Sequence, residues 1–557
     1  MNNNLADPFY YLENFRFVLT WVLERYRDLL TQHEIEFVEQ FSSIPIQSQA
    51  LLVRMVMRRG NLFRASKLSY PEIGDSIAAA LPLTVVGWIK YDSVLSVEQL
   101  FVVLTKNEFA TALQLKEKGG ARKTDLLEAA HALAYVPRRF SEWAVNGGDV
   151  LFEVQVADVC DRFRLMFFGN LYQDWSEFVL ADLGIFTYEK VSFCAASRAF
   201  TQRTDIDAYL HLHACRTRLS EGEALADVVC AVEALQLVNP WLQRRQAKLL
   251  YQIAFEFERL DDHAAALQIY ARCNYTGARQ RQIRVLEKLG LTSDAHALAS
   301  IAAAAPESAD ETQHLSRIMP RLARKLGLVV SRTPLKSAPD RIDLMLPSDA
   351  TQHVEELARC HIAQRDAQCA VYYVENALIN SLFGLLCWDA IFSPVQGAFF
   401  HPFQAGPADL HSATFHQLRA NQFKNALSQL SSHQYQHTIR ETFRVKAGIQ
   451  SPFVYWETLD EALLELALAC VPASHLEQWF LRILDGIALN RCGYPDLIQF
   501  WPQQQRYRMI EVKGPGDRLQ DNQIRFLDFC FQNQMPAAVC YVEWATDDGT
   551  NEGNLSD

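Results

Sequence analysis

Residues 493–544 read GYPDLIQFWPQQQRYRMIEVKGPGDRLQDNQIRFLDFCFQNQMPAAVCYVEW, and their pattern decides the fold of the C-terminal part of the chain. Two short β-prone runs, YPDLIQF and YRMIEVK, are separated by the polar run WPQQQR, which predicts a hairpin. GPGDR predicts a turn, LQDNQIRFLDFCFQN has helical spacing, and AAVCYVEW is typical of a strand. The predicted order is therefore strand, strand, helix, strand.

Three side chains of this segment are predicted to converge at one end of a sheet. Side chains alternate along a strand, so Glu511 and Lys513 share a face, and pairing in the hairpin can bring Asp496 beside them. Mg²⁺ and Mn²⁺ prefer oxygen ligands, and one or two such ions can orient a water and neutralise the charge of a phosphate. A lysine beside the metal can position the water or stabilise developing negative charge. This combination predicts phosphodiester cleavage.

The sequence Pro495-Asp496 followed by Glu511-Val512-Lys513 resembles the PD-(D/E)xK nuclease signature. Its context, with GYPDL in front, GPGD directly after Lys513 and Gln523 on the next helix in a supporting place, resembles the VRR-NUC branch of that superfamily. The alternative is an exposed strand pair at Glu511 and Lys513 with Asp496 in a turn. The resemblance implies an α/β, restriction-endonuclease-like nuclease domain over residues 345–557.

Upstream, residues 371–392 read VYYVENALINSLFGLLCWDAIF, which predicts a strongly apolar helix with one acid, Glu375, near its start. A carboxylate in such surroundings is unfavourable unless it is paired or bound to a metal. The alternative is that Glu375 lies at the solvated end of the helix.

The length of 557 residues predicts several domains, and 49% hydrophobic with 21% charged residues is typical of a folded protein. The start of the chain lacks a secretion signal and no run of about 18 apolar residues occurs, so we expect a cytoplasmic protein with no membrane partner. The 12 scattered cysteines show no zinc spacing and are expected to be buried free thiols.

The net charge of −12 argues against a nucleic-acid partner, but basic residues cluster locally. Two clusters in the first 125 residues are candidates for DNA binding, and for either one a solvated surface is the alternative. The first comprises Arg54, Arg58, Arg59, Arg64 and Lys67, and the second comprises Lys116, Lys118, Arg122 and Lys123. Arg54 and Arg58, four residues apart, are predicted to share a helix face.

The rest of the chain predicts a mainly α, multidomain protein. Residues 98–134 contain two predicted short helices around a basic turn and resemble a SAP module, a small helical DNA-binding element. Residues 249–273 resemble a tetratricopeptide hairpin with Tyr251, Leu260, Ala266 and Tyr270 at packing positions, residues 283–303 repeat it weakly, and residues 333–350 look like a connector. The predicted domains are 1–75 (helical, DNA-binding), 76–160 (SAP-like), 161–330 (helical repeats) and 345–557 (nuclease).

These segments occur in the order found in the Fanconi-associated nuclease family, which the whole chain resembles. The resemblance implies a structure-specific nuclease that cuts DNA near 5′ flaps and branch points, trims 5′ to 3′ and serves interstrand crosslink repair. It further implies that Asp496, Glu511, Glu375 and the Val512 carbonyl bind the metal and that Lys513 orients the water. The N-terminal and SAP-like regions would grip duplex DNA.

Eukaryotic members carry an N-terminal ubiquitin-binding zinc finger, whereas this sequence starts directly at the helical region. We therefore expect a bacterial, nucleoid-associated member without recruitment through ubiquitin. Two other functions are compatible with the sequence: a Holliday-junction-type resolvase of the same superfamily, and a repeat scaffold with an inert nuclease domain.

Overall fold

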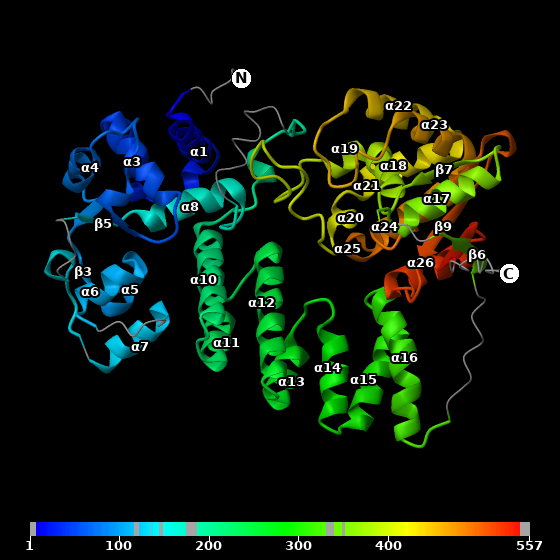
Figure 1. Ribbon diagram of the computed structural model, residues 1–557, viewed down its shortest axis with the longest axis horizontal. Helices are drawn as coiled ribbons and strands as arrows, with labels where there is room; N and C mark the ends of the chain where they lie inside the picture. The colour runs from blue at the N-terminus through cyan, green and yellow to red at the C-terminus, as the bar shows by residue number, and fades with distance from the viewer. Residues whose placement is uncertain are drawn as a thin grey trace, which may run out of the picture. The chain divides into compact units, whose positions relative to one another are not determined.

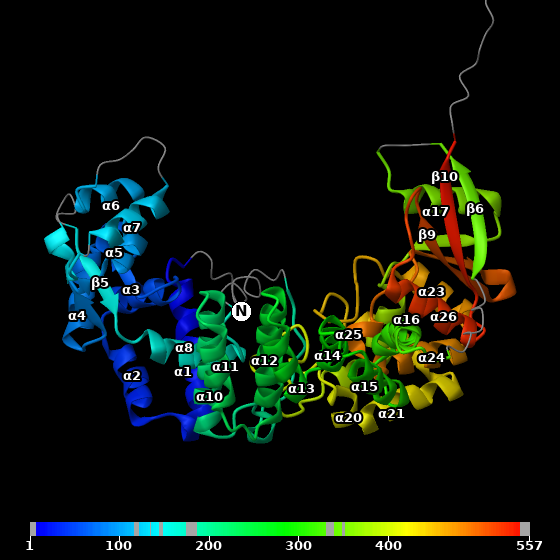
Figure 2. The same ribbon diagram turned by 90° about the horizontal axis from the view of Figure 1, so that it is seen from below.

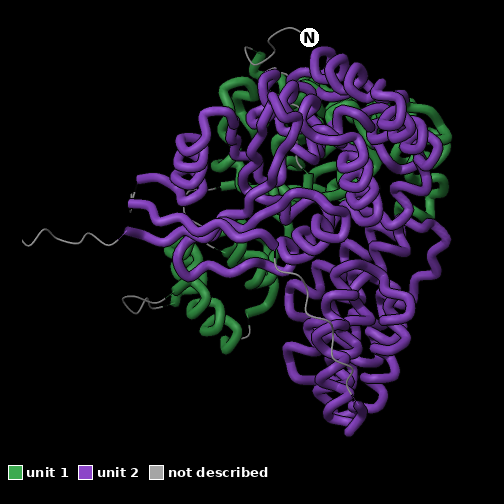
Figure 3. Tube along the Cα trace, turned by 90° about the vertical axis from the view of Figure 1, so that its right-hand side faces the viewer, with its two compact units in different colours: residues 1–187, 193–206, 400–403 green, residues 188–192, 207–399, 404–557 purple. Residues whose placement is uncertain are grey.

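The computed structural model describes residues 7–115, 122–133, 135–143, 149–173, 186–329, 339–347 and 351–545. The chain folds into two compact units, coloured separately in Figure 3. Unit 1 comprises residues 1–187, 193–206 and 400–403, and unit 2 comprises residues 188–192, 207–399 and 404–557. The structure thus groups the chain more coarsely than the four predicted domains.

Unit 1 is built first from helices with one apolar face. In the first helix, Tyr11, Phe15, Val18 and Val22 are buried at three- and four-residue spacing. The larger helices are α1 (Tyr10–Tyr26), α2 (Gln32–Ser43), α3 (Ile46–Val56), α4 (Ser76–Val85) and α8 (Ala157–Phe168). Because α3 ends at Val56, Arg58 lies in the turn that follows, and its predicted place on the helix face of Arg54 is wrong. The chain turns there to enter a strand.

Among the described residues of unit 1, two small sheets and three short α-helices accompany these larger helices. The antiparallel sheet has the order β1 (Leu62–Arg64), β5 (Leu151–Val154), β2 (Ile89–Tyr91), and β3 (Val94–Leu95) pairs with β4 (Arg138–Arg139). The SAP-like region contains α5 (Val97–Val103), α6 (Lys106–Ala112) and α7 (Lys123–Ala132). The first predicted helix is therefore two helices, because the Thr105 side chain caps a new one through the Glu108 amide.

The predicted repeats form a row of helices in which each packs on the next (Figure 1). They are α11 (Leu225–Glu233), α12 (Pro240–Arg259), α13 (His263–Arg272), α14 (Ala278–Lys288), α15 (Thr292–Ala304) and α16 (Ala309–Lys325), after α10 (Arg203–Ser220). Ala266 and Tyr270 are buried and the ring of Tyr251 contacts that of Tyr270, as predicted. The prediction for Leu260 is wrong: it follows the last turn of α12 and is 71% exposed.

The C-terminal part contains a mixed five-stranded sheet. Its order is β6 (Asp340–Leu346), β10 (Ala537–Trp544), β9 (Arg506–Lys513), β8 (Leu497–Trp501), β7 (Ala370–Tyr373). β10 runs parallel to β6 and β9, whereas β8 is antiparallel to β9 and β7. The predicted order of strand, strand, helix, strand is confirmed, with α26 (Asp521–Gln532) as the helix. The predicted connector is wrong in part, because its residues 340–346 form the edge strand β6.

One face of this sheet packs on α17 (Val354–Arg365), seen beside the strands in Figure 2. Ile510 and Val512 belong to the same core as Ala358 and Ile362 of α17. Because side chains alternate, Glu511 and Lys513 point to the opposite face.

The remaining helices are α18 (Leu378–Leu386), α19 (Trp388–Ile391), α20 (Phe415–Leu418), α21 (Ala420–Ser428), α22 (Gln434–Val445), α23 (Glu461–Cys470), α24 (Ala473–Asp485) and α25 (Ile487–Asn490).

The structure also bears on two other predictions, that the cysteines are buried free thiols and that no segment spans a membrane. All 12 cysteines are free. The prediction that they are buried is confirmed for seven of them, whereas Cys360 and Cys369 are partly exposed and Cys194, Cys230 and Cys492 are exposed. Among the described residues, no helix combines the length and the apolar character needed to cross a bilayer.

Candidate functional site

The end of the β8–β9 hairpin brings together the three predicted side chains. Asp496 directly precedes β8, and its Oδ2 accepts a hydrogen bond of 2.7 Å from the Val512 amide in β9. The Lys513 ammonium lies 2.7 Å from Oε1 of Glu511. Asp496, Glu511 and Lys513 are only 8%, 1% and 8% exposed, respectively. The predicted convergence of the two carboxylates and the amine is confirmed.

Gln523 reaches this group from helix α26. Its Nε2 donates to Oε1 of Glu511 at 2.6 Å, and its Oε1 accepts from the main-chain amide of Gln520, which caps the helix. Gln523 therefore fixes the orientation of Glu511 with respect to the start of α26, and its supporting role in catalysis stays a prediction.

The protein raises the pKa of both buried carboxyls. Burial raises the pKa of Asp496 to about 6, although the Val512 amide and the Lys513 charge lower it. Burial and then the charge of Asp496 raise the pKa of Glu511 to about 7, against the hydrogen bond from Lys513. Negative charge at this site is thus incompletely compensated by the one ammonium group.

Glu375 lies near the pair but not on a helix. β7 ends at Tyr373, and Glu375 occupies the turn before α18, with an exposed side chain. The prediction of a continuous helix over 371–392 is wrong, because residues 370–373 pair with β8 as a strand. The Glu375 charge nevertheless raises the pKa of both Asp496 and Glu511, so its carboxylate is within electrostatic reach of them.

The donor set of Asp496 and Glu511 fits a hard divalent cation. Two buried carboxylates with raised pKa values offer oxygen ligands and uncompensated negative charge, as Mg²⁺ or Mn²⁺ requires. Within the described ranges, no three His, Cys, Asp or Glu side chains are grouped closely enough to hold an ion by themselves. The two carboxylates are therefore the side-chain ligands that the geometry supports most strongly.

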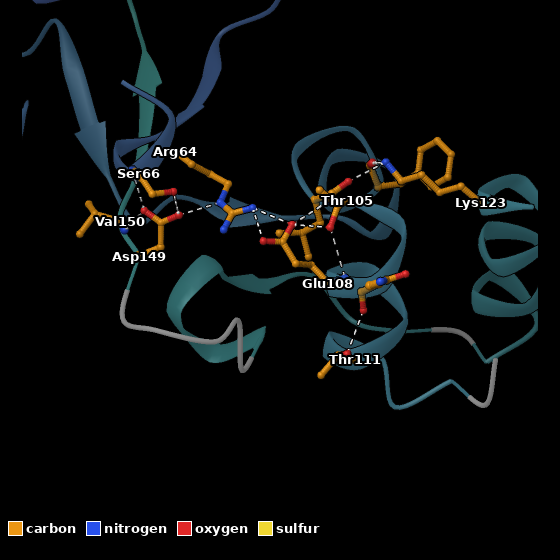
Figure 4. Close-up of polar contacts among 11 residues, drawn as sticks. Arg64, Ser66, Thr105, Glu108, Thr111, Lys123, Asp149 and Val150 are labelled. Carbon is orange, nitrogen blue, oxygen red and sulfur yellow. Dashed lines mark hydrogen bonds and ion pairs between the residues drawn. The ribbon is translucent and has the colours of Figure 1, made fainter. Parts of the chain in front are cut away.

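Two of the basic residues predicted to bind DNA have partners inside unit 1. Figure 4 shows the Arg64 guanidinium between Asp149, at 2.7 Å, and Glu108, at 2.8 Å, and the side chain is buried. The Lys123 ammonium donates to the carbonyls of Phe101 and Leu104 at the end of α5, and burial lowers its pKa. These hydrogen bonds and ion pairs connect the parts of unit 1.

The other basic candidates differ in exposure. Arg54 pairs with Glu72 at 2.7 Å and stacks on the Tyr11 ring. Arg58 donates to the Tyr70 hydroxyl at 2.5 Å, and its side chain is exposed, like those of Arg59 and Lys67. Arg122 is also exposed, whereas Lys116 and Lys118 lie outside the described residues.

Comparison with known proteins identifies the family. The Fanconi-associated nuclease 1 homolog of Pseudomonas aeruginosa is 52% identical over 549 residues, which cover 98% of this chain and 97% of that protein. The chain belongs to the Fanconi-associated nuclease family. A Fanconi-associated nuclease 1 homolog of Schizosaccharomyces pombe, 23% identical, covers 96% of this chain and 91% of that protein. The predicted family and its nuclease class are thereby confirmed.

Domain models and a solved structure agree with this membership in the Fanconi-associated nuclease family. The models match as "FAN1, HTH domain" over residues 9–90, "Fanconi anemia-associated nuclease SAP domain" over 94–143 and "VRR-NUC domain" over 430–544. A crystal structure of paFAN1 bound to 2nt 5′ flap DNA with a gap superposes with a TM-score of 0.90 at 51% identity, covering 98% of this chain and 100% of that chain. The start of the nuclease domain at residue 345 stays a prediction.

Two residues around Glu375 of this Fanconi-associated nuclease were not predicted from the sequence. The Tyr373 hydroxyl donates to Oε2 of Glu375 at 2.5 Å, and the Asn376 side-chain amide donates to Oε1 at 3.2 Å. The sequence does carry a signal for them: a tyrosine two residues before the acid and an asparagine directly after it. The long apolar run hides this signal because it favours a helix.

Proposed function

We propose that this chain is a structure-specific DNA nuclease that hydrolyses phosphodiester bonds near 5′ flaps and branch points and degrades DNA from 5′ to 3′, in interstrand crosslink repair. One observation carries the proposal: two buried carboxylates and an ammonium group share the end of the β8–β9 hairpin. They do so in a chain whose near relative of known structure is bound to 5′ flap DNA.

Asp496 and Glu511 would hold Mg²⁺ or Mn²⁺, one ion or two, with the Val512 carbonyl and Glu375 as further ligands. The cation would orient the attacking water and neutralise charge on the phosphate. Lys513 adds a positive charge beside Glu511, where it can hold the water or stabilise negative charge that develops on the phosphate. Gln523 keeps Glu511 in place through its 2.6 Å hydrogen bond.

DNA contacts in unit 1 are proposed for the exposed basic residues Arg58, Arg59, Lys67 and Arg122. Arg64, Lys123 and Arg54 have internal partners, so the proposed DNA-binding surface does not depend on them. Exposed cations of this kind bind phosphates without reading sequence, which suits an enzyme that recognises DNA shape.

A cleavage assay tests the proposal. The full-length protein is incubated with end-labelled 5′-flap, Holliday-junction and linear duplexes in Mg²⁺ or Mn²⁺ and then with chelator, beside Glu511→Ala and a matched control. Glu543→Ala is that control, because Glu543 is an exposed acid on the neighbouring strand β10.

We expect the wild type and Glu543→Ala to cut the flap duplex in a metal-dependent manner and Glu511→Ala to be inactive. Preferential cutting of the Holliday junction would instead support the resolvase. No cutting of any substrate would support the inert scaffold, and equal cutting by Glu511→Ala would move the active site elsewhere.

A further inference from the structure

Both carboxylate oxygens of Glu375 accept hydrogen bonds from side chains that lie within two residues of it along the chain. Tyr373 ends β7, and its hydroxyl donates to Oε2 at 2.5 Å; Asn376 donates to Oε1 at 3.2 Å. A carboxylate has about four acceptor positions, so these two bonds leave others for an ion. Glu375 is therefore oriented without being saturated.

The turn that carries Glu375 is itself tied to the segment that carries Asp496. Asn376 has a φ of 52°, and its Oδ1 accepts from the Tyr494 amide at 3.2 Å. The Val374 amide donates to the main-chain oxygen of Asp496 at 2.8 Å. The fully buried Asn380 donates to the main-chain oxygen of Asn376 at 2.6 Å. The backbone of the turn is thus fixed relative to the catalytic hairpin.

An exposed glutamate normally samples several rotamers, and ordering it on binding an ion lowers affinity. The half-exposed Tyr373 and its neighbour Asn376 restrict that freedom in advance, from opposite oxygens of the carboxylate. Groups that orient a metal ligand in this way commonly change metal affinity or activity by about ten- to a hundredfold.

We propose that Tyr373 and Asn376 are positioning residues that keep Glu375 in one orientation beside Asp496 and Glu511, so that the movement which must still bring the three carboxylates to one divalent cation starts from an ordered side chain. This inference rests on the proposed function, because it requires an ion at that centre. It assigns to the end of β7 a role in metal affinity rather than in folding or in contact with DNA.

Mn²⁺ binding by the full-length protein tests the proposal. Tyr373→Phe removes only the hydroxyl and is the cleaner variant. Asn376→Gly suits the positive φ but removes both the donor to Glu375 and the acceptor of the Tyr494 amide. Tyr372→Phe is the matched control, because Tyr372 points to the other face of β7, where its ring lies 6.3 Å from that of Phe500. Bound Mn²⁺ is measured from the electron paramagnetic resonance signal of the free ion, and DNA binding is measured separately in chelator.

We expect Tyr373→Phe and Asn376→Gly to bind Mn²⁺ about tenfold more weakly, with unchanged DNA affinity in chelator. Cleavage should need a correspondingly higher Mn²⁺ concentration. Tyr372→Phe should match the wild type in every measurement.

Two results would overturn the inference while leaving the nuclease intact: variants that bind Mn²⁺ as tightly as the wild type, or a Tyr373→Phe variant that loses only DNA affinity. A wild type that neither binds Mn²⁺ nor cuts flap DNA would overturn the proposed function as well.

Discussion

Asp496 and Val512 are joined across the hairpin: the Val512 amide donates to Oδ2 of Asp496 at 2.7 Å. One carboxylate oxygen is thereby fixed by the backbone. The same hydrogen bond links the residue before β8 to the residue between Glu511 and Lys513, so the hairpin register sets the geometry of the centre.

Neutralising Asp496 should separate activity from stability. Asp496→Asn keeps an oxygen for the Val512 amide but removes the charge, so we expect single-turnover cleavage to fall on the order of a hundredfold or more. The variant should unfold at a temperature a few degrees higher than the wild type near pH 8 without metal, because a buried carboxylate with a raised pKa is destabilising when ionised. Wild-type cleavage by this variant would show that Asp496 is not needed for catalysis.

The raised pKa values predict how stability depends on pH. The pKa values of Asp496 and Glu511 in the folded protein, about 6 and about 7, lie above the ordinary values of 3.8 and 4.5. The folded state therefore binds these protons more tightly than the unfolded chain. The stability that the protonated carboxyl groups of Asp496 and Glu511 contribute is present below about pH 4 and is lost as the pH rises through about 6 to 7.

Divalent cations compete with the same protons. We expect Ca²⁺ to raise the melting temperature more near pH 8 than near pH 5, since the carboxylates must be ionised to bind it. Thermal unfolding with and without Ca²⁺ measures this difference, and the double variant Asp496→Asn, Glu511→Gln should abolish it. An equal Ca²⁺ effect at both pH values would place the ion elsewhere.

The exposed basic residues of unit 1 should govern the salt dependence of DNA binding. Replacing Arg58, Arg59 and Lys67 with Gln should weaken binding and reduce the slope of log affinity against log salt by roughly one unit for each phosphate that the variant no longer binds. Lys123→Met is the contrast: it removes a capping ammonium from α5, so the melting temperature should fall while the slope stays unchanged. The reverse pattern would return Lys123 to the DNA-binding surface.

The last repeat helix should influence the catalytic centre through α26. Arg317 of α16 forms two hydrogen bonds, 2.7 and 2.5 Å long, with Asp521 at the start of α26, two residues before Gln523. Both side chains are about half exposed, so the pair contributes only about 0–1 kcal/mol to stability. We expect Arg317→Asp to lower kcat several-fold at an unchanged melting temperature.

A charge swap provides the control for that pair. Arg317→Asp combined with Asp521→Arg should recover part of the kcat, because the ion pair is restored in reverse. If the single variant is fully active, the position of α26 does not depend on this ion pair.

The sequence was informative where local pattern and tertiary structure agree. The hairpin, the turn and the following helix were predicted because alternation and turn residues are short-range signals, and these fixed Glu511 and Lys513 on one face. The place of Glu375 in a turn after a strand was not predicted, since the long apolar run around it favours a helix. Only pairing with β8 makes residues 370–373 a strand.

Other parts depend on partners far along the chain. The edge strand β6 exists because β10, about 200 residues later, offers a pairing edge, and no local signal in a proline-containing segment reveals this. Likewise Arg64 looked like a surface cation, but Glu108 and Asp149 surround it only after the fold has formed.

The most direct test of the proposed metal centre is the anomalous scattering of Mn²⁺ in crystals of the complex with 5′-flap DNA. We expect a peak about 2.1 Å from carboxylate oxygens of both Asp496 and Glu511, next to a DNA phosphate. A peak coordinated by neither carboxylate, or an ordered phosphate at Lys513 with no ion beside it, would refute this centre.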